Sequence, residues 1–199
     1  KKNPVLTENL AGLARLVEYT EDIGMIAGVR GVASWLDEAT LKDIAFAGLD
    51  YLTVPFASCD PAEHDLMDGA QGDQAAAIRA WELCHEWELC PVAQVPLTDE
   101  SCDELEEIIE LVVERNVSDL WFFAVACLDG EEQADAAGAL PARALLQAAT
   151  VVSEAADDYS ARFIWQPPVK FDLGKTLPEH VIAGPRASGD VAIRVEADG

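Results

Sequence analysis

Cysteine and histidine are the residue types in this chain that could bind a metal ion or carry out nucleophilic chemistry. The cysteines follow one another at separations of 25, 6, 12 and 25 residues, and no two of them form a CxxC pair. Because this spacing fits neither a disulfide framework nor a zinc site, we expect reduced thiols that are buried. The three histidines are also far apart, so we predict no metal ligands in this chain. The cysteines are Cys59, Cys84, Cys90, Cys102 and Cys127.

Four polar residues stand within or after apolar, strand-like runs. The carboxyl ends of the strands in a parallel barrel face the active site, so these side chains are candidates to line a substrate cavity. Arg30 is of particular interest, because an acidic protein needs a local cation to hold an anionic substrate. The alternative for each is a side chain that anchors a loop or lies partly in solvent. The candidates are Arg30, Ser58, Gln94 and Gln166.

Three further residues have both a functional and a structural interpretation. His64 lies in an acidic stretch and could act as a general acid or base, but we expect a surface histidine. Cys127 ends the most apolar run and could face a cavity, although a small buried side chain is the simpler interpretation. Trp165 stands at a strand end and could reach a ligand, whereas Trp81 and Trp121 lie in apolar patterns typical of a core.

Short apolar runs alternate with longer amphipathic segments along the chain, which predicts βα units around a parallel sheet. The runs are almost continuously apolar, as is typical of strands covered on both faces. We expect strands at 25–29, 51–54, 91–97, 120–126 and 161–166, and helices near 7–23, 37–47, 74–88, 101–114 and 141–156. Residues 55–73 are predicted as an acidic loop whose glycines, Gly69 and Gly72, form a turn before a helix cap rather than a phosphate-binding loop.

About five such units favour an open barrel over a closed one of eight. We therefore predict an α/β fold, a partial (open) TIM-like (βα) barrel over residues 1–168 with about five parallel strands. Residues 169–199 are expected to form a short, hairpin-like C-terminal extension that contains the alternating run 191–195. Because Asp198 and Gly199 form a dipeptide common in hairpin turns, we expect a partner strand to follow in a longer parent.

The charge balance excludes some classes of partner. The chain has 37 acidic and 13 basic residues, a net charge of −24. Such a field repels nucleic acid and anionic membrane surfaces, so we expect neither as a partner. No apolar run is long enough to span a bilayer and the first residues do not resemble a secretory signal, so we expect a cytoplasmic protein. The acidity is consistent with a solvated surface or with adaptation to high salt.

Two neighbouring segments carry a family resemblance. Residues 47–50 read AGLD, and residues 55–69 read PFASCDPAEHDLMDG. In this order they resemble the core of the radical S-adenosylmethionine (radical SAM) enzymes, of the type that includes the molybdenum-cofactor biosynthesis protein A and the SPASM-domain maturases. That family has AGLD at a helix end and then a segment like SLDSxDPExHDxxxG. Pro55 and Ala57 stand here where the family has the serine and the aspartate of SLD.

The resemblance also implies cofactor contacts at the front of the chain. Asn3 and Pro4 look like the end of the family's Gly-Gly-Glu/Asn-Pro motif, whose backbone approaches the amino group of S-adenosylmethionine. Gly31 stands where the family has the glycine of a Thr-Asn-Gly segment. Asn3, Pro4 and Gly31 are therefore the cofactor-binding residues that the resemblance implies. At the other end, residues 193–199 look like the hairpin before a cysteine of the auxiliary-cluster region.

The CxxxCxxC motif that binds the 4Fe-4S cluster lies upstream of the Gly-Gly-Glu/Asn-Pro motif in this family, so we expect a fragment of a longer parent. The resemblance implies that the full-length parent binds a 4Fe-4S cluster and S-adenosylmethionine and generates a 5'-deoxyadenosyl radical to modify a small-molecule or peptide substrate. No catalytic residue is predicted in this chain, which should be inactive alone.

Two other functions remain open. A degenerate, non-catalytic barrel could serve as a binding or scaffold module. An unrelated TIM-barrel isomerase or aldolase is less well supported, because no lysine on a core strand and no carboxylate and histidine set suggests such chemistry. The oligomeric state is not predicted.

Overall fold

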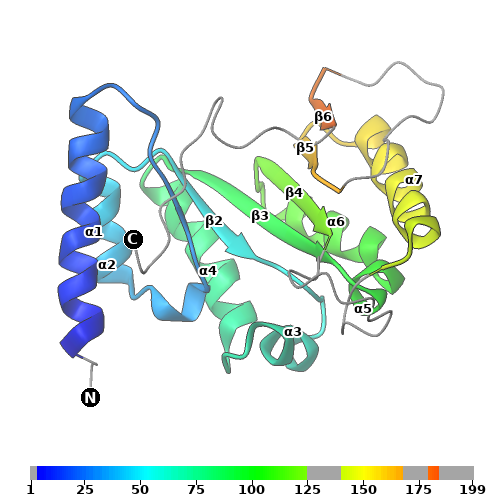
Figure 1. Ribbon diagram of the computed structural model, residues 1–199, viewed down its shortest axis with the longest axis horizontal. Coiled ribbons are helices and arrows are strands. Elements are labelled where there is room, and N and C mark those ends of the chain that lie inside the picture. The colour runs from blue at the N-terminus through cyan, green and yellow to red at the C-terminus, as the bar shows by residue number, and fades with distance from the viewer. Residues whose placement is uncertain (1–3, 125–139, 168–178, 184–199) are drawn as a thin grey trace, which may run out of the picture.

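Six short strands, all parallel, form one open sheet in the computed structural model, which describes residues 4–124, 140–167 and 179–183. The strands lie side by side in chain order, with β1 and β6 at the edges (Figure 1). Each parallel pairing requires a crossover connection, which explains why helices separate most of the strands. The strands are β1 (Gly28–Arg30), β2 (Tyr51–Pro55), β3 (Cys90–Leu97), β4 (Asp119–Ala124), β5 (Arg162–Trp165) and β6 (Val181–Ala183). The α/β fold, a partial TIM-like barrel, is confirmed.

Seven α-helices and one 3-10 helix, η1, are present in the described residues. In Figure 1, α1 and α2 lie side by side at one end of the molecule, and α7 lies near β5 and β6 at the other. Side chains cap several helix starts: the Asp37 carboxylate accepts from Thr40 N–H before α2, and Asp60 accepts from Ala62 N–H before α3. The helices are α1 (Pro4–Asp22), η1 (Ala33–Trp35), α2 (Glu38–Phe46), α3 (Pro61–Asp68), α4 (Asp73–Glu86), α5 (Asp99–Asp103), α6 (Leu105–Glu114) and α7 (Ala142–Asp158). Among these described helices, none is both long and apolar enough to cross a membrane.

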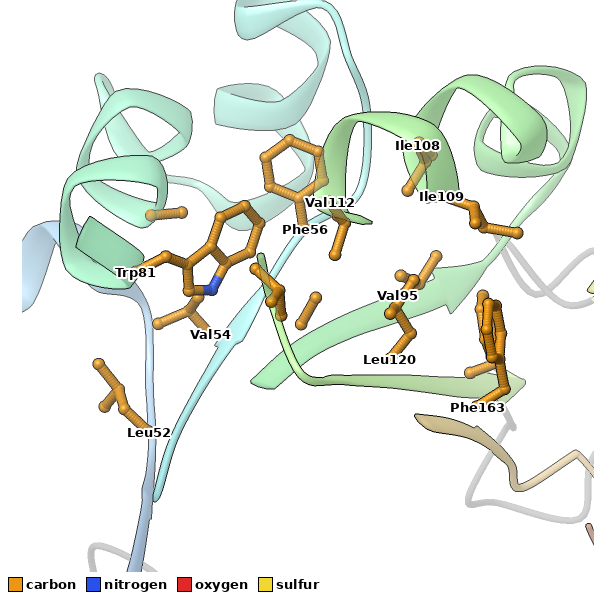
Figure 2. Packing of buried hydrophobic residues seen from close by; sticks show 14 of the residues in the cluster. Leu52, Val54, Phe56, Trp81, Val95, Ile108, Ile109, Val112, Leu120 and Phe163 are labelled. Carbon is orange, nitrogen blue, oxygen red and sulfur yellow. The ribbon is translucent and has the colours of Figure 1, made fainter. Parts of the chain in front are cut away.

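The hydrophobic core lies between the helices and one face of the sheet, called the helix face below. Alternate strand residues point to this face, as the period of two in a strand requires. Figure 2 shows Trp81 of α4 beside Val54 and Phe56, and Ile108 and Val112 of α6 above the strands. The opposite face is the inner face of the barrel. Its members alternate with the core residues along the strands and include Tyr51, Thr53, Gln94, Trp121 and Phe123.

All five predicted strands and five predicted helical regions are present, with ends that differ by a few residues. The predicted helix over 101–114 is divided into α5 and α6, because the backbone leaves the helical region at Glu104. Helix α3 was predicted as loop, since it has only eight residues. The sixth strand, β6, is only three residues long and pairs in parallel with β5 within the segment expected as an extension. The run 191–195 and Cys127 lie outside the described residues.

Candidate functional site

Among the residues that the structure describes, three buried polar atoms on the inner face have no hydrogen-bond partner. Thr53 is 1% exposed and Gln94 is 4% exposed. Thr53 Oγ1, Gln94 Oε1 and the indole Nε1 of Trp121 are all unpartnered. Leaving such a group unpaired costs about 1–3 kcal/mol, so proteins seldom do so without reason. The inner face therefore has hydrogen-bonding capacity that the described residues do not use. A fourth unpartnered atom among them, Trp81 Nε1, lies in the core.

The strand register brings these atoms together. Gln94 is paired with Pro55 on one side and with Trp121 on the other, and Thr53 is paired with Arg30. Residues paired across a parallel sheet point to the same face, so the three polar groups occupy adjacent strands, β2, β3 and β4. We call this part of the inner face the polar surface, although Thr53 itself is paired with Val92 on β3.

A cation and aromatic rings surround this polar surface. The Arg30 guanidinium carbon lies 5.8 Å from the centroid of the Phe123 ring, so the side chain reaches from β1 to β4. The rings of Tyr51 and Trp121 have centroids 6.1 Å apart. The inner face therefore combines unpartnered polar atoms, aromatic rings and the guanidinium of Arg30.

The remaining sequence-predicted site residues lie around this surface. Ser58 follows β2 and is fully buried, where its hydroxyl accepts from Asp60 N–H at 2.9 Å and donates to Glu63 at 3.4 Å. Gln166 follows β5, and its side chain is exposed. Gly31 N–H donates to Thr53 O at 3.2 Å, which extends the pairing of β1 with β2.

Two candidates from the front of the chain complete the set. Pro4 begins α1, and Asn3 lies outside the described residues. The roles predicted for Asn3, Pro4 and Gly31 in cofactor binding stay predictions. So do the cavity roles of Arg30, Ser58, Gln94 and Gln166, of which the structure brings Arg30 and Gln94 onto the same face.

Two sequence-based interpretations are wrong. His64 was expected at the surface but is completely buried, because α3 turns its ring inward against Phe56, with ring centroids 5.2 Å apart. Trp165 was considered for ligand contact but is completely buried on the helix face. Its register partner Phe122 is a core residue, so both rings point toward the helices.

Sequence reasoning also missed two members of the inner face. Trp121 was assigned to the core, and Thr53 was treated only as part of a strand. A strict period of two from Leu52 and Val54 would have placed Thr53 on the opposite face. No local signal distinguishes the two faces of the run 120–124, because almost all its residues are apolar.

The thiols in the described residues all have raised pKa values. Burial, reinforced by Glu104 and Glu107, raises the pKa of Cys59 to about 11. Burial raises the pKa of Cys84 to about 12 and that of Cys102 to about 11. Burial thus disfavours the thiolate, which is the form that binds a metal ion. No three His, Cys, Asp or Glu side chains in the described ranges are grouped to hold a metal ion, so this set does not fit an iron-sulfur cluster.

No protein family model matches the chain. Among solved structures, Streptococcus suis SuiB is similar with a TM-score of 0.60 and 12% identity, over 77% of this chain and 35% of SuiB. SuiB has also been solved bound to S-adenosylmethionine. The protein anSMEcpe, solved with AdoMet and the Kp18Cys peptide, gives a TM-score of 0.52 and 14% identity, over 68% of this chain and 37% of anSMEcpe.

A third structure, the radical S-adenosylmethionine methyltransferase TsrM from Kitasatospora setae, matches 57% of this chain and 23% of TsrM, at 15% identity and a TM-score of 0.44. The chain spans little more than a third of the length of SuiB and anSMEcpe. At such low identity the likeness concerns the backbone alone. This chain therefore shares its open parallel barrel with SuiB and anSMEcpe.

Proposed function

We propose that this chain is the core barrel of a radical SAM protein and that its inner face binds S-adenosylmethionine. The observation that carries the proposal is the set of unpartnered buried atoms on Thr53, Gln94 and Trp121. S-adenosylmethionine has an amino group, hydroxyl groups, a carboxylate and an adenine ring, which supply both donors and acceptors. The fold shared with two proteins solved with this molecule supports the choice of ligand.

The charges of the chain favour this ligand as well. S-adenosylmethionine carries a net positive charge because of its sulfonium group, and a protein of net charge −24 attracts cations. Within the site, the Arg30 guanidinium is suited to the ligand's carboxylate. The rings of Tyr51 and Trp121 offer faces to the sulfonium or to adenine. These residues bind and orient the ligand and exclude water from it.

Radical chemistry belongs, in this proposal, to the full-length parent. A 4Fe-4S cluster supplies the electron that such enzymes need, and the described thiols do not fit that cluster. The chain alone is therefore expected to bind S-adenosylmethionine without cleaving it.

Isothermal titration calorimetry of the chain with S-adenosylmethionine tests the proposal. Gln94→Leu removes an unpartnered acceptor with little change of volume and should weaken binding by about tenfold. Gln147→Leu makes the same change on an exposed position of α7 and should leave binding unchanged. S-adenosylhomocysteine, which lacks the sulfonium charge, should bind more weakly. Absence of binding by the folded wild-type chain would overturn the proposal.

The non-catalytic alternative is tested on the full-length parent. Anaerobic reconstitution with iron and sulfide should give a charge-transfer absorbance and cleavage of S-adenosylmethionine. A parent that binds S-adenosylmethionine but takes up no cluster would instead be a degenerate barrel that acts as a binding or scaffold module.

A further inference from the structure

A completely buried histidine and aspartate connect the loop after β1 with the loop after β2. His64 Nδ1 accepts a hydrogen bond from Ala57 N–H at 3.1 Å. His64 Nε2 lies 3.4 Å from Asp73 Oδ2, and Asp73 Oδ1 accepts from Ser34 N–H at 2.6 Å. His64 and Asp73 are each 0% exposed. A continuous chain of hydrogen bonds therefore runs from Ser34, after β1, to Ala57, after β2.

The contacts determine the state of the imidazole. Ala57 N–H can only donate, so His64 Nδ1 must carry a lone pair rather than a proton. The ring proton is then on Nε2, where it points to the Asp73 carboxylate. A doubly protonated ring would place two donors, Nδ1–H and Ala57 N–H, against each other. The arrangement requires neutral His64 in the Nε2–H form.

The ring has little freedom to move. The centroid of the His64 ring lies 5.2 Å from the centroid of the Phe56 ring. The Phe56 ring centroid lies 5.1 Å from the ring centroid of Trp81, a core residue. The helix face thus holds the imidazole in place from one side, and Asp73 holds it from the other.

The first turn of α4 is the common anchor. Asp73 begins this helix, where the positive end of the helix dipole favours a carboxylate. Gln74 Nε2, next to it, donates to Ser58 O at 3.0 Å and to Cys59 O at 2.8 Å. Both residues of this turn therefore hold the loop after β2, and Asp73 also holds the loop after β1.

We propose that His64 and Asp73 are positioning residues that couple the loop after β1 to the loop after β2, so that both loops keep one relative position at the ligand-binding end of the barrel. The inference that this serves S-adenosylmethionine binding rests on the proposed function. The coupling itself rests on the contacts and can be tested without a ligand.

The first test uses the wild-type chain, so it does not depend on a variant that folds. Nitrogen-15 NMR of the His64 ring should show the neutral Nε2–H form, with Nδ1 unprotonated. An Nδ1–H or a doubly protonated ring at neutral pH would contradict the hydrogen bonds to Ala57 and Asp73 and would overturn the proposal.

The second test compares two substitutions that disrupt the contact between His64 and Asp73 from either side. In His64→Asn the side-chain oxygen can replace Nδ1 and keep the bond from Ala57 N–H, but the contact with Asp73 is lost. In Asp73→Asn one of the two acceptor oxygens becomes a donor. His85→Asn, at the far end of α4, is the matched control, because His85 is exposed and contacts only Arg115 O among the hydrogen bonds found for it.

Amide hydrogen exchange measures the coupling. In His64→Asn, exchange of Ser34 N–H should accelerate by about tenfold, although its own acceptor, Asp73, is unchanged. Asp73→Asn should accelerate Ala57 N–H in the same way, and His85→Asn should change neither. If Ser34 N–H in a folded His64→Asn variant exchanges at the wild-type rate, the two loops are held independently and the proposal fails.

A ligand experiment separates this proposal from the proposed function. In the wild type, bound S-adenosylmethionine should slow exchange at both Ser34 and Ala57, whereas in His64→Asn it should slow them to different extents. If exchange at Ser34 and Ala57 is coupled but the chain does not bind S-adenosylmethionine, the positioning roles of His64 and Asp73 stand and the proposed ligand is rejected. If the chain binds S-adenosylmethionine but exchange at the two amides is not coupled, the proposed ligand stands and the positioning roles are rejected.

Discussion

The two faces of the sheet differ in whether the described chain satisfies them. On the helix face, Leu52, Val54 and Phe122 are completely buried among apolar side chains. On the inner face, the neighbouring residues Thr53 and Trp121 present polar atoms that have no partner. The comparison shows that the helix face is filled by apolar side chains, while the inner face keeps polar atoms that no described residue pairs with.

Energetic arguments support this division. Complete burial of a large apolar side chain stabilises a protein by about 1.5–3 kcal/mol, whereas a buried polar atom without a partner costs about 1–3 kcal/mol. The inner face is therefore retained at the expense of stability. Such a cost is typical of a functional surface.

The largest difference between the faces should be seen in β4. Phe122 stacks near Phe163 on the helix face and is completely buried, whereas Phe123 is half-buried on the inner face. Phe122→Ala should lower the free energy of unfolding by about 3–5 kcal/mol, because it leaves a cavity in the core. Phe123→Ala should cost about 1 kcal/mol, since less burial is lost. Urea unfolding measures both, and equal losses would contradict the assignment of faces.

A smaller difference is expected from two neighbouring residues of β2. Val54→Thr places a hydroxyl in the apolar core and should destabilise the chain by about 1–3 kcal/mol. Thr53→Val removes a hydroxyl that has no partner, so stability should stay unchanged or rise by up to about 1 kcal/mol. Urea unfolding measures both changes in stability. Thr53→Val should also weaken the binding of S-adenosylmethionine, which calorimetry measures. A large destabilisation by Thr53→Val would mean that its hydroxyl has a partner.

The smallest effect concerns two half-buried thiols, so the expectation that the cysteines are buried is wrong for them. The pKa values of Cys59 and Cys102 are raised to about 11, above the ordinary value of a thiol, because burial and nearby carboxylates disfavour the thiolate. Above the ordinary pKa, the unfolded state releases thiol protons that the folded state retains. The free energy of unfolding is therefore unaffected below the ordinary pKa and falls as the pH rises from that value through the raised pKa of the folded state. Urea midpoints should fall slightly as the pH rises from about 9 to about 11, and less so in Cys59→Ala or Cys102→Ala. An identical fall in all three proteins would assign the effect to other groups.

The sequence predicted much of the fold and only part of the site. Strand β3 and helix α4 followed from an apolar run and an amphipathic segment, which depend on residues close together in the chain. Gln94 was predicted to line a substrate cavity, a role that stays a prediction, and the structure places it on the inner face. His64 was misjudged because its neighbours in sequence are acidic and polar, while its neighbours in space are Phe56 and Asp73. The sequence could not show that the hydroxyl of Thr53 lacks a partner.

By itself, the sequence determined the alternation of strands and helices and the turn formed by Gly69 and Gly72, both of which have positive φ. These features depend on backbone conformation and on contacts within a few residues. Only the tertiary structure decided that Arg30 lies over Phe123 and that unpaired atoms converge on one face. The physical reason is that burial and hydrogen-bond satisfaction depend on strand register and packing, which join residues far apart in the chain.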